Sequence, residues 1–142
     1  MLNGADIAAL IPHQGRMCLL DQVESWDATG ISCSSAAHRD PLNPLRRQGR
    51  LAAICTAEFA LQAMALHGAL TAGGPQPQGF VTSLRDVLVA EPFADHLPGS
   101  LRVEAALLAA ESRGHIYRFT VTAGGRPVVS GQAAIHVPEG QP

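Results

Sequence analysis

The chain has 142 residues, of which 46% are hydrophobic and 15% charged, and its formal net charge is −2. This composition excludes an intrinsically disordered chain, and the length predicts a single domain over residues 1–142. The small net charge gives no global reason to expect a nucleic acid or an anionic membrane as partner.

The cysteines are odd in number and widely spaced, at Cys18, Cys33 and Cys55, with no C-x-x-C pair. Zinc sites and disulfide frameworks use paired cysteines, so we expect reduced thiols in a cytoplasmic protein, with no metal site. No cofactor is expected either. The N-terminal stretch carries Asp6 in its middle and lacks a basic region followed by a long apolar core. It is therefore not expected to be a signal peptide.

The first elements in chain order are a short helix and a hairpin. Asn3 is a plausible N-cap for a helix over residues 3–10, and Pro12 would end it. The apolar stretch 17–23 predicts a strand, and 31–37 predicts its return strand after a turn at residues 27–30.

Residues 49–70 form the longest apolar run and predict a central helix. Its apolar side chains fall on every side of a helical wheel, so we expect burial on nearly all sides. The run is as long as a membrane span of about 20 residues. However, Glu58, Gln62 and His67 are spaced through it, and intramembrane carboxylates are rare, which favours a helix in a soluble protein and no membrane span.

A linker rich in Gly, Pro and Gln follows at residues 73–79, and the rest of the chain reads as strands. Apolar and polar residues alternate there, and short turns join neighbouring runs, which predicts an antiparallel sheet. The expected strands are 80–89, 100–110, 115–122 and 127–137. The fold class is therefore α+β, an antiparallel β-sheet wrapped around a long central α-helix. A helix that is apolar all round needs more cover than one small sheet gives, so we expect a dimer or a tightly curled sheet.

Glu58 and Gln62 are four residues apart, which places them on one face of the helix. Apolar surroundings favour the protonated form of a carboxyl group, as a general acid working near neutrality requires. The alternative is a buried Glu58 that is bonded to Gln62 or to the backbone and has no chemical role.

All ten basic residues are arginines. Four of them lie within a dozen positions and form the basic cluster, Arg39, Arg46, Arg47 and Arg50. Because Arg makes bidentate contacts to anions, the cluster could bind a phosphate or an acidic partner surface. The alternative is a solvated loop with ordinary surface arginines.

Several stretches together resemble one family. IPHQGRMCLLDQV at residues 11–23 resembles the opening of the hot-dog-fold β-hydroxyacyl-carrier-protein dehydratases, and AEFALQAMALHG at 57–68 resembles the E-x-x-A-Q-A segment of their central helix. HRDPLNPLRRQGRL at 38–51 is most similar to the ApeP-like branch, which is associated with aryl-polyene lipid clusters. The later stretches GFVTSLRDV, LPGSLRVEA and GGRPVVSGQAA match that branch in order.

The resemblance implies a hot-dog subunit, in a homodimer or in a hetero-oligomer with a related subunit, that dehydrates a 3-hydroxyacyl thioester. The substrate would be carried on the phosphopantetheine of an acyl carrier protein, and the product would be the trans-2-enoyl thioester. Glu58 matches the family's acid, and Gln62 would orient it. The amides of Ala53 and Ile54, at the helix N-terminus, would hold the thioester carbonyl. The basic cluster would meet the acidic carrier protein.

The catalytic base is where the chain departs from the fatty-acid-synthesis enzymes. Their histidine lies in a GHFPG loop, which residues 43–49 replace without any His. His13, in the Ile11-Pro12-His13 motif, is the best substitute. His38 is the second candidate, or else a loop histidine bonded to Asp40. His67 is expected to be a core or helix-end residue, and the remaining histidines are expected at the surface: His96, His115 and His136.

Two other functions remain open at this stage. Hot-dog thioesterases also carry an acid on the central helix, where it activates water to release a free acid and a thiol. The missing GHFPG histidine also fits a catalytically silent subunit that binds acyl chains or pairs with an active homologue.

Overall fold

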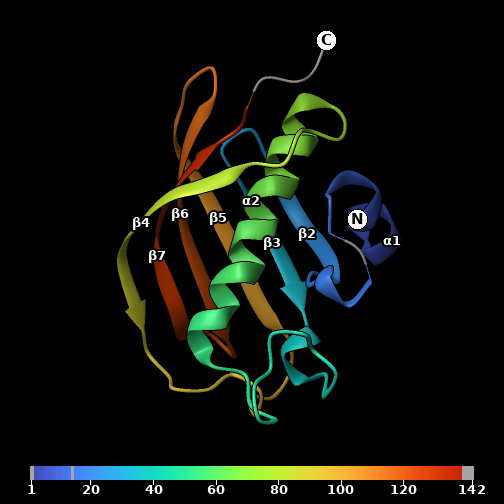
Figure 1. Ribbon diagram of the computed structural model, residues 1–142, viewed down its shortest axis with the longest axis vertical. Coiled ribbons are helices and arrows are strands. Elements are labelled where there is room, and N and C mark those ends of the chain that lie inside the picture. The colour runs from blue at the N-terminus through green and yellow to red at the C-terminus, as the bar shows by residue number, and fades with distance from the viewer. Residues whose placement is uncertain (1, 14, 139–142) are drawn as a thin grey trace.

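The computed structural model describes residues 2–13 and 15–138, which form a seven-stranded antiparallel sheet and one long helix (Figure 1). The sheet order is β1-β2-β3-β5-β6-β7-β4. The strands are β1 Leu2–Asn3, β2 Gln22–Asp27, β3 Gly30–Ser35, β4 Phe80–Val89, β5 Leu101–Ala110, β6 Gly114–Ala123 and β7 Arg126–His136. The helices are α1 Gly4–Leu10 and α2 Ala57–Ala72, with 3-10 turns η1 Gly15–Met17, η2 Ala37–Arg39 and η3 Ala53–Thr56.

Helix α1 begins with the cap that the sequence predicts. The Asn3 side chain accepts hydrogen bonds from the amides of Ala5 and Asp6, and the Asp6 carboxylate accepts one from the Asn3 amide. This reciprocal capping box satisfies amides that a helix start leaves without partners. The helix ends at Leu10, and Ile11 is extended, as the residue before a proline prefers.

The predicted first strand begins later than the sequence suggests. Residues 17–21 lie outside the strand, and β2 starts at Gln22. The backbone amide of Leu19 donates to the Gln62 side chain of α2, and the Met17 carbonyl accepts from the same side chain. These backbone groups are therefore not free to join the sheet. The return strand is confirmed as β3, although it ends at Ser35 rather than at residue 37.

Helix α2 also begins later than predicted. Arg47 and Arg50 exchange backbone hydrogen bonds across a tight turn. Within that turn, Gln48 and Gly49 have φ angles of 52° and 75°, which no right-handed helix accepts. The helical path starts with η3 and ends at Ala72, after which Gly73 takes the left-handed conformation typical of a helix C-terminus.

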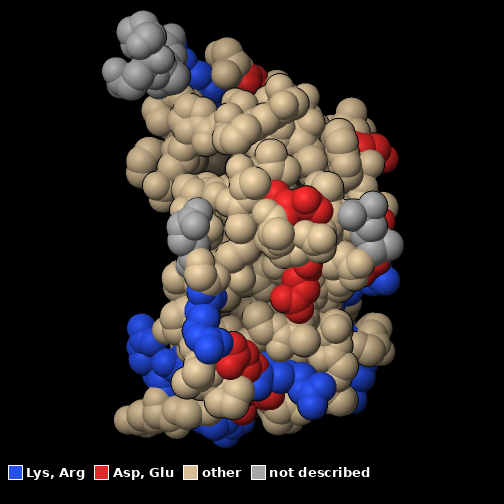
Figure 2. All heavy atoms as spheres, turned by 90° about the vertical axis from the view of Figure 1, so that its right-hand side faces the viewer, with Lys and Arg blue, Asp and Glu red and all other residues tan. Residues whose placement is uncertain are grey.

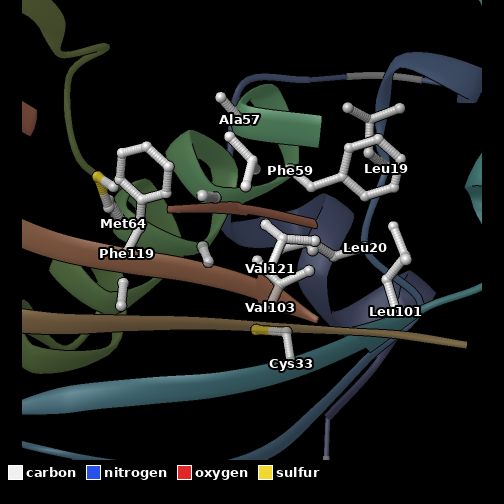
Figure 3. Close-up of a cluster of buried hydrophobic side chains, with 14 of the residues drawn as sticks. Leu19, Leu20, Cys33, Ala57, Phe59, Met64, Leu101, Val103, Phe119 and Val121 are labelled. Carbon is white, nitrogen blue, oxygen red and sulfur yellow. The ribbon is translucent and has the colours of Figure 1, made fainter. Parts of the chain in front are cut away.

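The core lies between α2 and one face of the sheet. Phe59 and Met64 of α2 belong to the same buried cluster as Val103 of β5 and Phe119 of β6 (Figure 3). The alternation predicted for these strands is therefore confirmed. The expectation that α2 is covered all round is wrong on one side. An outer stripe stays exposed at Glu58, Ala65, Thr71 and Ala72, because the sheet covers only the opposite side.

Within the described residues, one helical stretch, Ala53–Ala72, is long and apolar enough to cross a membrane. Of its most apolar window, 61% is buried inside the structure. A core helix passes the same test of length and composition, so the stretch is weak evidence for a membrane span.

Strand β4 forms one edge of the sheet, with β7 as its only strand partner among the described residues. It exposes five large apolar side chains, Phe80, Val81, Leu84, Leu88 and Val89. A long apolar edge with an unpaired backbone is a surface that proteins usually cover or pair.

Gly131 of β7 provides a stability test of this sheet. A Cβ atom there would lie 3.0 Å from Phe119 and 3.1 Å from Val87. We expect Gly131→Ala to lower the free energy of unfolding by about 1–3 kcal/mol through overpacking. Gly114→Ala in β6 is the control, because nothing lies within 4 Å of its Cβ position. Urea unfolding measures both, and equal midpoints would contradict this packing.

Candidate active site

A pocket of about 450 Å³ runs along the outer stripe of α2. The segment after α1, the linker 73–79 and strands β4, β6 and β7 supply its other walls. His13 and Glu58 both line it, together with the apolar side chains of Leu61, Met64 and Val81. The two residues that the sequence analysis proposes as base and acid therefore lie on the walls of one pocket.

Glu58 lies in the first turn of α2. Its expected burial is wrong for the single chain, because its side of the helix faces away from the sheet and the residue is exposed. The exposed carboxyl group borders the pocket and is accessible to a bound molecule.

His13 is half-buried at the exit of α1. Its Nδ1 atom is inaccessible to solvent and has no hydrogen-bond partner among the described residues. Buried polar atoms are normally paired, and no described residue supplies the partner of this nitrogen.

The resemblance implied that Gln62 orients Glu58, but the Gln62 side chain is bonded to other groups. This side chain is buried, Nε2 donates to the Met17 carbonyl at 2.6 Å, and Oε1 accepts from the Leu19 amide at 2.8 Å. Both polar atoms of the amide are thus used by the segment that follows His13. Gln62 ties this segment to the helix that carries Glu58.

The two expected amide donors differ. The Ala53 amide donates to the Pro92 carbonyl at 3.0 Å, so the expectation that it is free for a substrate is wrong. Ile54 follows it in η3 and is exposed, and the role of its amide stays a prediction. Neither residue is among those that line the pocket of the single chain.

His38 is not bonded to Asp40, and it is not among the residues that line the pocket. It is fully buried, and its Nε2 lies 2.9 Å from the Leu97 carbonyl. A carbonyl can only accept, so Nε2 carries the proton of the neutral ring. Burial lowers the pKa of His38 below its ordinary value. Asp40 instead pairs with Arg16 at 2.7 Å.

His67 is the core residue that the sequence analysis expects. It is fully buried, with Nε2 2.8 Å from the Asp27 carbonyl and Nδ1 2.8 Å from the Tyr117 hydroxyl. Nε2 must donate to the carbonyl, so Nδ1 accepts the hydroxyl proton of Tyr117. Burial raises the pKa of Tyr117 to about 12, which keeps this donor protonated.

His115 was expected at the surface, and this was wrong. It is half-buried, lines the pocket and stacks on Tyr117 with ring centroids 6.4 Å apart. The signal that could have found it is the strand alternation itself. Tyr117 and Phe119 face inward, and the period of two extends back to His115.

The basic cluster is held largely by its own loop. Arg46 donates to the carbonyls of Gly49 and His38, and Arg47 donates to those of Pro44 and Arg46. Figure 2 shows basic side chains gathered at the lower end of the molecule, the end where Figure 1 places the loop before α2.

Two members of the cluster have other surroundings. Arg50 pairs with Asp95 at 3.1 Å and lies over the Phe93 ring. Arg39 is exposed, without an ion pair to another described residue.

The family comparison covers almost the whole chain. The model of the family described as ApeP-like, ApeP dehydratase, matches residues 5–142. The chain belongs to the ApeP-like dehydratase family. The resemblance stated from the sequence is thereby confirmed for this ApeP-like chain. Among curated proteins, none matches it in sequence.

Solved structures show the fold of this ApeP-like protein. The dehydratase heterocomplex ApeI:P from Xenorhabdus doucetiae matches with a TM-score of 0.84 and 21% identity, covering 94% of this chain and 91% of that chain. A mutant thioesterase from Pseudomonas aeruginosa matches with a TM-score of 0.58 and 14% identity, covering 82% and 81%. A hypothetical thioesterase with coenzyme A from Streptococcus pneumoniae matches with a TM-score of 0.62 and 11% identity, covering 85% and 88%. The predicted hot-dog fold is confirmed.

Replacing Gln62 tests its bonds to the segment after His13. Gln62→Leu leaves the Leu19 amide and the Met17 carbonyl without partners, so we expect the free energy of unfolding to fall by about 1–3 kcal/mol. The Leu19 amide should also exchange its hydrogen faster. Gln132→Leu, in β7, is the matched control and should leave the exchange rate of the Leu19 amide unchanged. Slow exchange at Leu19 in Gln62→Leu would contradict the assignment.

His38 makes stability depend on pH. Its pKa is lowered in the folded chain, so below about pH 6.5 the unfolded chain binds a proton that the folded chain refuses. The free energy of unfolding should therefore fall as pH drops from about 6.5 towards the lowered pKa. His38→Gln keeps a donor for Leu97 and should reduce this pH dependence. Denaturant unfolding of both proteins across this range measures the difference, and identical slopes would contradict it.

Proposed function

We propose that this protein dehydrates 3-hydroxyacyl thioesters carried on acyl carrier protein to trans-2-enoyl thioesters, in fatty-acid or aryl-polyene-type lipid biosynthesis. The observation that carries the proposal is the presence of His13 and Glu58 on the walls of one pocket. Membership of the ApeP-like dehydratase family supports the reaction class. The unpaired cysteines favour a cytoplasmic location.

The reaction needs a base and an acid. In the proposed mechanism, His13 removes a proton from C2, and Glu58 in its protonated form donates a proton to the leaving 3-hydroxyl. The C2–H and C3–O bonds break, a C2–C3 double bond forms and water leaves. The elimination is redox-neutral, and the proton that His13 gains is matched by the one that Glu58 gives up. The reaction therefore needs no cofactor. Negative charge develops on the thioester oxygen, where the Ile54 amide is the candidate donor.

The pocket suits an acyl chain. Leu61, Met64 and Ile135 line it between the polar groups, and burial of methylene groups against such side chains is favourable. The chain would lie along α2, with its thioester end at Glu58.

The carrier protein is proposed to meet the basic cluster. Arg39 is exposed and forms no ion pair with another described residue, while Arg46 and Arg47 donate to loop carbonyls. Fixed guanidinium groups lose little freedom on binding an acidic surface. In Figure 1 the loop that carries them lies at the same end of the molecule as the start of α2.

A second hot-dog subunit is proposed to pair with the exposed edge of β4, as a homodimer or a hetero-oligomer. The apolar side chains of β4 and its unpaired backbone edge support this. The ApeI:P structure is a heterocomplex of a dehydratase, which supports a related partner. Val81 of β4 lines the pocket, so a subunit on this edge would border it.

Two alternatives have specific support. The thioesterases among the similar structures fit hydrolysis, with the Glu58 carboxylate activating water. The heterocomplex fits a silent subunit that works only with an active partner.

Mass spectrometry of 3-hydroxyacyl carrier protein incubated with the chain separates these functions. We expect loss of one water, with the rate reduced about 10²–10⁴-fold in Glu58→Gln and in His13→Ala. Glu111→Gln and His96→Ala are matched controls at exposed positions outside the pocket and should retain the rate.

The other outcomes contradict the proposal in different ways. Release of the acyl group indicates a thioesterase. Turnover that needs a related hot-dog subunit and is unaffected by Glu58→Gln in this chain indicates a silent subunit. Full activity of His13→Ala would exclude His13 as the base.

A further inference from the structure

The pocket extends far beyond the two proposed catalytic groups. It contains both Glu58 and Ala72 of α2, which are fourteen residues apart on the same stripe. At 1.5 Å per residue, this part of the helix is about 21 Å long. The far end therefore receives the part of an acyl chain that is distant from the reacting carbons.

The lining changes character along this length. The middle is apolar, but the far end contains Thr71 of α2, Gln76 and Gln78 of the linker, Ser112 between β5 and β6, and His115 of β6. In Figure 1 the end of α2, the linker and the end of β7 lie together at the upper end of the molecule. An acyl chain that ends in a methyl group would gain nothing from such polar groups.

His115 lies near this end and not near Glu58. His67, which bonds Tyr117, is nine residues after Glu58, or about 13 Å along the helix. His115 precedes Tyr117 by two residues on β6, which adds about 6–7 Å along the strand. This step leads towards the linker, because the neighbouring Gly114 pairs with His136, which also pairs with Phe80.

The imidazole of His115 stacks on a fixed neighbour, and its nitrogens remain available. Its ring stacks on Tyr117 at an interplanar angle of 28°. Tyr117 is fixed in turn by its bond to His67, which is bonded to the Asp27 carbonyl. No hydrogen bond joins the His115 ring to another described residue, and the side chain is half-buried. A neutral imidazole offers one donor and one acceptor nitrogen.

We propose that His115 is a specificity residue that binds a hydroxyl or carbonyl group at the distal end of the acyl chain. This inference rests on the proposed function and names a feature of its substrate. A distal hydroxyl can donate to or accept from the ring. A methyl end displaces water from the ring and leaves both nitrogens unpaired, which costs affinity.

Binding of unreactive ligands tests the inference apart from catalysis. The probes are acyl pantetheine thioesters from octanoyl to hexadecanoyl, without a 3-hydroxyl, each with either a methyl or a hydroxyl at the distal end. Titration calorimetry measures their affinities. We expect the hydroxyl form to bind about tenfold more tightly, at the chain lengths that reach His115, because a neutral hydrogen bond contributes about that factor.

Variants identify the residue responsible. His115→Phe keeps a ring to stack on Tyr117 and should remove or reverse the preference for the hydroxyl form. His115→Gln keeps a donor and an acceptor and should retain part of it. His136→Phe, at an exposed strand position outside the pocket, is the matched control and should retain all of it.

Equal affinities for both forms at every length would overturn the inference, as would an unchanged preference in His115→Phe. Failure of all probes to bind would overturn it as well. The hydroxyl preference without any dehydration of carrier-bound substrate contradicts the proposed reaction but leaves this site in place. Dehydration of carrier-bound substrate without any hydroxyl preference supports the proposed reaction and overturns the role of His115.

Discussion

The structure depends on how an almost wholly apolar helix is covered by one sheet. The sheet reaches only one side of α2, where Phe59 and Met64 pack against strand residues such as Phe119. The opposite side therefore stays open as a stripe, and the segment after α1, the linker and the first part of β4 close over it to form the pocket. Incomplete cover of the helix thus places Glu58 in a pocket wall instead of in the core. The same shortage of cover leaves the apolar edge of β4 available to another chain.

Hydrogen bonds from side chains to the backbone fix the two segments that lead into the site. Gln62 bonds two backbone groups of the segment after His13, so the proposed base and the proposed acid are attached to one rigid helix. At the start of that helix, the Asp95 carboxylate accepts from the Leu51 amide and pairs with Arg50, which holds the chain as it enters η3. Each of these bonds satisfies a group that would be costly to bury alone. The site is therefore positioned by side-chain to backbone bonds, while the apolar core supplies stability.

The sequence predicted the elements that local patterns control. Alternation placed β4 to β7 to within one residue at each end, and the Asn3 cap follows from hydrogen bonds within one turn. The sequence-based prediction failed where contacts between residues far apart in the chain determine the structure. The start of β2 depends on Gln62, which is 43 residues from Leu19, and the burial of His38 depends on Leu97, 59 residues away. The exposure of Glu58 likewise depends on which side of the helix the sheet covers. A helical wheel that is apolar all round carries no information on that choice.

The histidines show why residue type alone could not assign the site. His38 and His67 each have a nitrogen beside a backbone carbonyl, and both are fully buried, so their protons are committed to the fold. His13 and His115 line the pocket, and neither ring is bonded to another described residue. A ring that serves the structure and a ring that can serve a ligand thus differ in their partners, not in sequence context. The two available rings lie in one pocket with Glu58, as the proposed reaction and the proposed distal contact both require.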